Sequence, residues 1–141
     1  MIKKAWAVWK GSVKEGGGTI STETGVLKET PYGFKSRFES GPGTNPEELI
    51  GAAHAGCFSM ALSSMLGQAG LTAEKIETHA AITLEKVGDA FAITASHLDV
   101  VAKVPNATAQ QFAEIANKAK AGCPVSKVLN AKITMTAKLE S

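Results

Sequence analysis

Alternating apolar and polar positions at the start of the chain predict β structure over residues 1–40. Trp6 and Val8 alternate with smaller neighbours, and residues 19–24 form a β-branched segment of period two. Glycines around Gly17 and the Pro-Tyr-Gly segment at 31–33 mark the turns between such short segments. We therefore expect an N-terminal antiparallel β-meander of roughly three strands.

A long helix is predicted over residues 46–68. Asn45 suits the N-cap, Pro46 the first helical position, and Glu48 the third position of a capping box. No charged residue occurs from position 49 to position 73. A helix that is apolar on all sides is buried on all sides, and a chain this short has little material to surround it. The pattern predicts a buried central helix that a second subunit helps to cover.

A β-hairpin follows the helix. Residues 80–85 and 91–104 alternate with period two on either side of a Gly88-Asp89 turn. The apolar positions are odd-numbered at the start of the second strand and even-numbered from Leu98 onward. We expect a β-bulge near Ser96-His97 because such a residue shifts the parity of the strand.

Two more helices and a last strand complete the pattern. Thr108 precedes a helix over residues 109–121, and Pro124 suits the first position of a short third helix. Residues 132–139 alternate between outward polar and inward apolar positions. This order of elements predicts an α+β fold, and a length of 141 residues predicts a single domain over residues 1–141.

Composition and charge exclude several kinds of partner. The chain carries 15 Lys+Arg against 13 Asp+Glu, and these charges are spread along it, so we expect no nucleic-acid partner. The central helix holds a histidine and three serines within its most apolar part, which argues against a membrane span. The N-terminus lacks the apolar segment of a signal peptide, so we expect a cytoplasmic protein in a reducing compartment.

The two cysteines, Cys57 and Cys123, are candidate redox groups. One interpretation is that each is a small buried apolar residue with no reactive role. The alternative is a pair in which one thiol attacks and the other resolves. Cys123 stands at a predicted helix N-terminus, which favours a thiolate. Cys57 lies further along its helix and needs a cation from a tertiary contact, so the residues alone leave open which thiol attacks.

Arg37 is the sole arginine among the 15 basic residues, and it is the natural candidate for that cation. A guanidinium stays protonated and is less strongly hydrated than an ammonium group. A carboxylate is needed to fix its fork in a bidentate pair. Glu47 lies ten residues before Cys57, about 15 Å along the helix axis, and is placed to anchor Arg37.

His54 lies three residues before Cys57, so the two share a helix face. A metal site is not expected, because His79 and His97 lie on predicted strands without a matching spacing. A Cys-His nucleophilic pair is not expected either, because proximity on one helix supplies no third group to orient the histidine. The favoured interpretation is a core or interface histidine with a hydrogen-bonded ring.

Several segments resemble the Ohr/OsmC family of thiol peroxidases. They are residues 22–27 (TETGVL), 31–34 (PYGF), 37–39 (RFE), 43–62 (GTNPEELIGAAHAGCFSMAL) and 118–126 (KAKAGCPVS). These segments span nearly the whole chain and contain both cysteines. The arginine that follows the Pro-Tyr-Gly segment is more like the OsmC branch than the organic-hydroperoxide-resistance branch.

This resemblance implies an OsmC-like fold in an intertwined homodimer, with active sites at the subunit interface that use residues of both chains. It implies that Cys57 is the peroxidatic thiol, Cys123 the resolving thiol, Arg37 the residue that stabilises the thiolate, and Glu47 the residue that orients Arg37. The implied substrate is an organic hydroperoxide, with hydrogen peroxide reduced less well. The implied reductant is a dithiol such as a lipoyl group on a protein, and no metal, flavin, haem or nucleotide cofactor is implied.

Two other functions are open on the residues alone. The same thiol pair suits a redox sensor or binding module, which gives a stoichiometric burst with peroxide rather than turnover. A structural dimer with inert cysteines is the third alternative, and its thiols resist alkylation at mildly acid pH.

Overall fold

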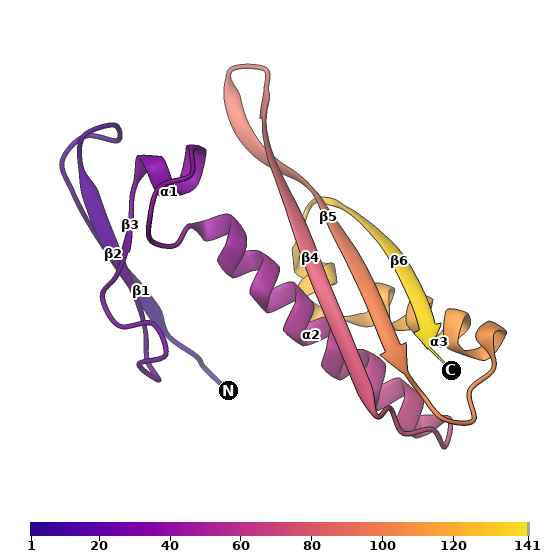
Figure 1. Ribbon diagram of the computed structural model, residues 1–141. Coiled ribbons are helices and arrows are strands. Elements are labelled where there is room, and N and C mark those ends of the chain that lie inside the picture. The colour runs from indigo at the N-terminus through magenta and orange to yellow at the C-terminus, as the bar shows by residue number, and fades with distance from the viewer. Residues whose placement is uncertain (141) are drawn as a thin grey trace. The chain divides into compact units, whose positions relative to one another are not determined.

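The computed structural model describes residues 1–140 and divides the chain into two compact units (Figure 1). The first unit is Met1–Leu49, and the second begins at Ile50. Helix α2 (Pro46–Gln68) begins in the first unit and runs through the second. The expectation that the chain is a single domain stays a prediction.

The first unit contains an antiparallel meander, as the sequence predicted. Its strands are β1 (Ala5–Lys10), β2 (Gly17–Thr22) and β3 (Thr30–Tyr32), hydrogen-bonded in the order β1-β2-β3. A short helix, α1 (Phe34–Phe38), follows β3. Helix α1 was not predicted from the sequence, because a helix of five residues is too short to show a period in its apolar positions.

The start of α2 is fixed by two hydrogen bonds of the Asn45 side chain. Its Oδ1 accepts a hydrogen bond of 2.8 Å from the Glu48 N–H, which confirms the predicted N-cap. The Glu48 carboxylate does not return to the cap; it accepts a bond of 2.7 Å from the Thr44 hydroxyl, so only half of the expected capping box forms. Asn45 Nδ2 donates to the Ser36 carbonyl at 2.9 Å and so ties α2 to α1.

The second unit is built on a three-stranded sheet with helices on one face (Figure 1). Its elements are β4 (Lys75–Val87), β5 (Ala90–Lys103), α3 (Ala109–Gly122), α4 (Pro124–Val128) and β6 (Lys132–Glu140). Strand β5 is central: it pairs with β4 in the predicted antiparallel hairpin and with β6 in parallel. Helices α3 and α4 supply the crossover that a parallel pair requires. The predicted bounds of α3 are confirmed to within one residue, and the predicted start of α4 at Pro124 is confirmed.

The expected β-bulge lies at a different residue of β5. Thr83 pairs with Ala95 and Leu84 with Ile93, so Thr94 is the extra residue rather than Ser96 or His97. The sequence prediction was wrong because Ser96 is polar and was not counted with the inward positions. Ser96 is in fact fully buried, so the inward parity begins before Leu98.

One stripe of α2 forms the centre of the core of the second unit. Phe58, Leu62 and Leu66 are fully buried on it and pack with apolar side chains of β5 and α3. Those partners include Leu98 on β5 and Phe112 on α3. Burial of such side chains stabilises the fold by roughly 1.5–3 kcal/mol per side chain relative to exposure.

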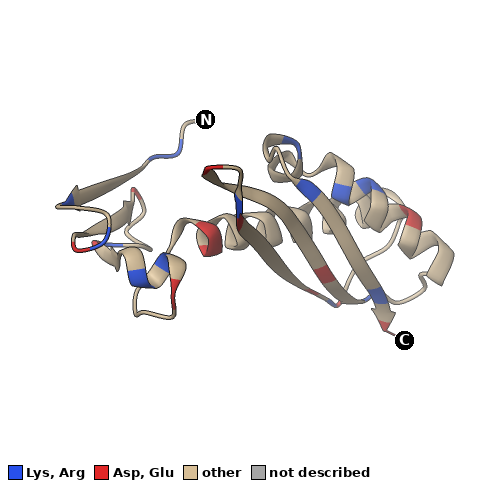
Figure 2. Cartoon of the chain, turned by 90° about the horizontal axis from the view of Figure 1, so that it is seen from above, with Lys and Arg blue, Asp and Glu red and all other residues tan. Residues whose placement is uncertain are grey.

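The single chain does not bury α2 on all sides, as the shortage of covering residues predicted, and cover by a second subunit stays a prediction. Only 28% of its most apolar 18-residue window is buried, and Met60 is 77% exposed. No charge follows Glu48 on this helix (Figure 2). By length and composition alone α2 also meets the criteria for a membrane span, as the core helix of a soluble protein does. A large apolar face of α2 is therefore left uncovered by the described residues of its own chain.

Loss of the Asn45 side chain is expected to destabilise the protein more than loss of an ordinary helix cap. Thr108, whose hydroxyl accepts from the Gln111 N–H at 3.1 Å, is the matched control at the start of α3. We expect Thr108→Ala to lower the free energy of unfolding by about 1 kcal/mol, the cost of one N-cap. Asn45→Ala loses a cap and the bond to Ser36, so we expect about 2 kcal/mol. Urea unfolding measures both, and equal losses would show that the bond to Ser36 contributes nothing.

Candidate active site

An ion pair in the first unit joins α1 to the first turn of α2. Arg37 donates from Nη2 to Glu47 Oε1 at 2.9 Å and from Nε to the same oxygen at 3.2 Å. The expected bidentate geometry is therefore not formed, because both donors converge on one oxygen. Within residues 1–140, the buried Glu47 Oε2 has no hydrogen-bond partner. The carboxylate fixes the guanidinium and retains one unused acceptor.

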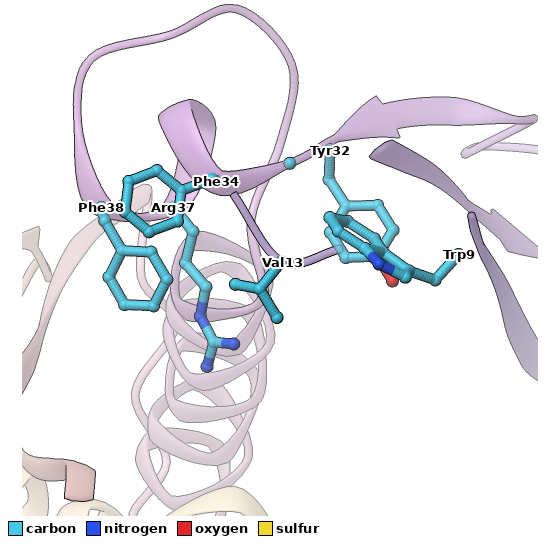
Figure 3. A pocket seen from close by; sticks show the side chains of 7 residues that line it. Trp9, Val13, Tyr32, Phe34, Arg37 and Phe38 are labelled. Carbon is cyan, nitrogen blue, oxygen red and sulfur yellow. The ribbon is translucent and has the colours of Figure 1, made fainter. Parts of the chain in front are cut away.

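Arg37 also forms part of the wall of an aromatic pocket (Figure 3). The pocket has a volume of about 260 Å³ and is lined by Trp9, Val13, Tyr32, Gly33, Phe34, Arg37 and Phe38. The Phe34 and Phe38 rings lie 5.0 Å apart between centroids, and Trp9 and Tyr32 meet edge to face at 5.3 Å. The Arg37 guanidinium carbon lies 5.4 Å from the Phe38 centroid, within cation–π range. This pocket was not predicted from the sequence, in which its one signal was the cluster of aromatic residues around Arg37.

The two cysteines meet in the second unit. Cys57 is half-buried on α2, and Cys123 is fully buried between α3 and α4. Both are free thiols, and their side chains lie within hydrogen-bonding reach of each other. They are 66 residues apart in sequence, so only the packing of α2 against α3 and α4 brings them together.

The surroundings of the two thiols favour charge on Cys123. Burial raises the pKa of Cys57, and the hydrogen bond that it shares with Cys123 raises it further. Burial also disfavours a thiolate at Cys123, but the polar contacts around it outweigh this penalty and lower its pKa. Those contacts are the Cys57 thiol, the N–H and hydroxyl of Ser126, and the Val125 N–H. Within this unit alone, Cys123 therefore ionises more readily than Cys57.

His54 lies at the centre of a buried polar cluster on the same helix face as Cys57. Its Nδ1 is 2.7 Å from the Ser96 hydroxyl oxygen on β5, and its Nε2 is 2.7 Å from the Ser126 hydroxyl oxygen on α4. Burial lowers the pKa of His54, which favours the neutral ring. The prediction of a core histidine with a hydrogen-bonded ring is confirmed. Among residues 1–140, no three His, Cys, Asp or Glu side chains are grouped to hold a metal ion.

The structure brings the four predicted site residues into two pairs, one in each unit. Arg37 contacts Glu47 in the first unit, and Cys57 contacts Cys123 in the second. The roles assigned to them stay predictions. Neither Ser96 nor Ser126 was predicted from the sequence as a partner of His54, although Ser126 lies three residues after Cys123 in a segment that carried the resemblance.

Comparisons with known proteins assign the chain to one protein family. The model of the OsmC-like protein family matches residues 39–138. The chain is 58% identical over 139 residues to "Peroxiredoxin OsmC" of Escherichia coli strain K12, covering 99% of this chain and 97% of that protein. It is 34% identical over 101 residues to "Organic hydroperoxide resistance protein-like 1" of Staphylococcus epidermidis, covering 71% of each.

Solved structures share the fold at lower sequence identity. The organic hydroperoxide resistance protein OhrB of Bacillus subtilis is 22% identical with a TM-score of 0.68, over 97% of this chain and 98% of that one. An OsmC-like protein of unknown function from Vibrio cholerae is 16% identical with a TM-score of 0.77, over 97% and 99%. The α+β fold of this chain is therefore the one that these proteins share.

Burial of a neutral His54 is expected to make the protein less stable below pH 6.5. The folded state disfavours the charged ring, whereas the unfolded chain protonates near 6.5, so the unfolded state binds more protons as the pH falls. The free energy of unfolding should fall by at most about 1.4 kcal/mol per pH unit from this one group. Urea unfolding at pH 7.5 and 5.5 measures the difference.

The control for this measurement is His54→Gln, which carries no titrating group at that position. Its loss of stability between the two pH values should be smaller than that of the wild type by about 1 kcal/mol. An unchanged pH dependence in His54→Gln would contradict the assignment.

Proposed function

The chain belongs to the OsmC-like family of cysteine-based peroxidases, and we propose that it reduces organic hydroperoxides in the cytoplasm with Cys57 as the attacking thiol. In this proposal Cys123 resolves the oxidised Cys57, Arg37 holds Cys57 as a thiolate, and Glu47 orients Arg37. The observation that carries it is a half-buried thiol within reach of a fully buried one. The names of the relatives, a peroxiredoxin and a hydroperoxide resistance protein, support the same chemistry.

Accessibility supports Cys57 as the thiol that meets the peroxide. A hydroperoxide reaches a sulfur only where solvent also reaches it, and Cys123 is 0% exposed. Cys57 is partly exposed on α2. Because Cys123 has the lower pKa and no access, it is suited to attack an oxidised sulfur beside it rather than a substrate from solution.

The thiolate on Cys57 requires a cation, because burial and Cys123 both raise its pKa. An opposite charge close to the thiol favours its ionised form. We assign this role to Arg37, because Glu47 fixes its guanidinium and its Nη1 is not engaged in the bonds to Glu47. Arg37 donors would also stabilise the negative charge that develops on the leaving oxygen.

The proposed reaction balances over two steps. The Cys57 thiolate attacks the distal peroxide oxygen, the O–O bond breaks, and the products are a sulfenic acid on Cys57 and an alkoxide that takes a proton from water. Cys123 then displaces hydroxide from the sulfenic acid, and a Cys57–Cys123 disulfide and water result. The peroxide is reduced and the two sulfurs supply its electrons, so the reaction as proposed uses no cofactor.

The aromatic pocket supports an organic substrate. Its wall includes Arg37, so a hydroperoxide whose oxygens are held by the guanidinium would place its apolar part among Phe34, Phe38 and Trp9. Burial of an alkyl or aryl group there contributes roughly 0.8 kcal/mol per methylene. Hydrogen peroxide has no such group and is expected to be reduced less well.

We propose a dithiol, such as a lipoyl group on a protein, as the reductant. Exchange begins when a thiolate attacks one sulfur of the disulfide, and the more accessible sulfur belongs to Cys57. A second thiol on the same molecule then completes the exchange without a free intermediate. The disulfide is transient in this cycle, which suits a reducing compartment.

We propose that the protein acts as an intertwined homodimer with residues of both chains in each active site. The uncovered apolar face of α2, with Met60 at 77% exposure, supports a second copy as its cover. Strand β1 supports it too, since Trp6 and Val8 are 56% and 48% exposed. The unused Glu47 Oε2 is a further buried group that a partner chain can satisfy.

Cysteine variants test the proposed roles directly. Cys57→Ser should lose peroxidase activity entirely, because it lacks the attacking sulfur. Cys123→Ser should consume one equivalent of cumene hydroperoxide and then stop or over-oxidise, because nothing resolves the sulfenic acid. Peroxide consumption without a dithiol measures the single equivalent in Cys123→Ser, because an added dithiol would itself resolve the sulfenic acid. Consumption with dihydrolipoamide in excess measures Cys57→Ser and the wild type, which should turn over many times.

The control for these variants is the rate at which the wild type reduces an aryl hydroperoxide, an alkyl hydroperoxide and hydrogen peroxide. We expect this rate to be lowest for hydrogen peroxide. A Cys57→Ser protein that consumed cumene hydroperoxide at the wild-type rate would end the assignment. A wild-type protein that stopped after one equivalent with dithiol present would be a sensor rather than an enzyme.

Mixing of inactive variants tests whether each site uses two chains. Arg37→Ala and Cys57→Ser should each be inactive alone. After unfolding and refolding together, about half of the dimers are mixed, and each of these holds one intact site of two. We therefore expect about a quarter of the wild-type activity in the mixture. A mixture without activity, although it forms mixed dimers by mass spectrometry, would place Arg37 and Cys57 of one site in the same chain.

A further inference from the structure

A buried histidine in the second unit takes no part in the proposed reaction. His54 is 0% exposed, and both of its ring nitrogens lie 2.7 Å from a serine hydroxyl oxygen. Those serines belong to different elements: Ser96 to β5 and Ser126 to α4. A buried imidazole between two hydroxyls is costly to desolvate, so its place in the core calls for a physical reason.

The Ser126 end of this cluster leads to the resolving thiol. Ser126 lies three residues after Cys123, and both its N–H and its hydroxyl form hydrogen bonds with the Cys123 sulfur. These contacts, with those of Cys57 and Val125, lower the pKa of Cys123 although burial opposes them. A polar series therefore runs from Ser96 through His54 and Ser126 to Cys123, with Cys57 beside its end.

With a neutral His54 ring, only one arrangement of protons satisfies every member of this series when Cys123 is a thiolate. A thiolate accepts hydrogen bonds and donates none, so Ser126 Oγ–H must donate to it. The Ser126 oxygen then accepts from His54 Nε2–H. A neutral ring protonated at Nε2 has a lone pair at Nδ1, which accepts from Ser96 Oγ–H. Burial of His54, which favours the neutral ring, is consistent with this order.

We propose that His54 is a positioning residue for the resolving step: by donating from Nε2 to Ser126, it holds the Ser126 hydroxyl proton toward Cys123 and so speeds attack on oxidised Cys57. This inference rests on the proposed function, in which Cys123 is the resolving thiol. Without the imidazole, the Ser126 oxygen loses the hydrogen bond from Nε2, and its hydroxyl proton can rotate away from Cys123.

The step that His54 promotes is formation of the disulfide. The Cys123 thiolate attacks the Cys57 sulfenic sulfur, the S–S bond forms, and the S–O bond breaks. Hydroxide leaves and combines with the proton that Cys123 had given up, so that one water is released. Cys123 sulfur is oxidised and Cys57 sulfur is reduced. His54 keeps its proton count throughout and acts only through the Ser126 hydroxyl.

Three variants separate this role from simple packing. His54→Asn places an amide near the Nδ1 position and loses the donor to Ser126, whereas His54→Gln extends an amide donor to the Nε2 position. Ser126→Ala removes the hydroxyl at a half-buried position where alanine is easily accommodated. The measurement treats reduced protein with one equivalent of cumene hydroperoxide, quenches with acid and an alkylating agent, and follows the disulfide by mass spectrometry.

We expect His54→Asn and Ser126→Ala each to slow disulfide formation about 10-fold, the effect of one pKa unit on the thiolate fraction. Oxidation of Cys57, measured as peroxide consumption in the same samples, should keep its wild-type rate. His54→Gln should restore disulfide formation to within about threefold of the wild type. The double variant of His54→Asn with Ser126→Ala should be no slower than Ser126→Ala, because the two residues act in series.

Three outcomes would overturn the inference. Wild-type rates of disulfide formation in Ser126→Ala would show that its hydroxyl does not serve Cys123. Equal slowing by His54→Asn and His54→Gln would reduce the histidine to a packing role. Multiplied effects in the double variant would make the two residues independent. A wild-type protein that consumed peroxide without forming the disulfide would instead refute the proposed function.

Discussion

The packing of one stripe of α2 against the sheet decides where each reactive group of the second unit lies. Phe58, Leu62 and Leu66 are fully buried on that stripe and set the rotation of the helix about its axis. At 3.6 residues per turn, His54 lies one turn before Phe58 and falls inside the core. Cys57 is the neighbour of Phe58 and falls at the edge of the stripe, where it is half-buried. A change in this rotation would expose the histidine and move the thiol.

The same packing gives two identical side chains different chemistry. Cys57 loses hydration without gaining a cation within its unit, whereas Cys123 gains polar contacts from Ser126 and Val125. One thiol is accessible and holds its proton, and the other is inaccessible and loses it more readily. In the proposed cycle the accessible thiol ionises, so we propose that its stabilising cation comes from outside this group of residues.

The first unit holds a cation that is suited to this role. Glu47 fixes Arg37 through one oxygen, and an aromatic pocket adjoins the guanidinium. An arginine between a carboxylate and an apolar pocket suits a substrate with a polar peroxide group and an organic part. The uncovered faces of α2 and β1 support the proposed second chain, through which the two pairs of residues would be joined.

Local interactions explain what the sequence by itself determined. The N-caps at Asn45 and Thr108, the turn at Gly88 and the alternation along β6 act over a few residues, so the order of elements and most of their bounds follow from the pattern. The candidate residues Arg37, Glu47, Cys57 and Cys123 were likewise identified by residue type and by the family resemblance, and the structure forms two contacting pairs from them.

Only the tertiary structure decided the partners of buried polar groups. Ser96 and Ser126 lie 42 and 72 residues from His54, and no periodicity links positions so far apart. The position of the bulge, which lies at Thr94, was predicted wrongly for the same reason. The burial of Ser96 depends on a histidine from another element. Hydrogen bonds between distant segments form only after apolar packing has brought those segments together, so the sequence pattern carries no local signal of them.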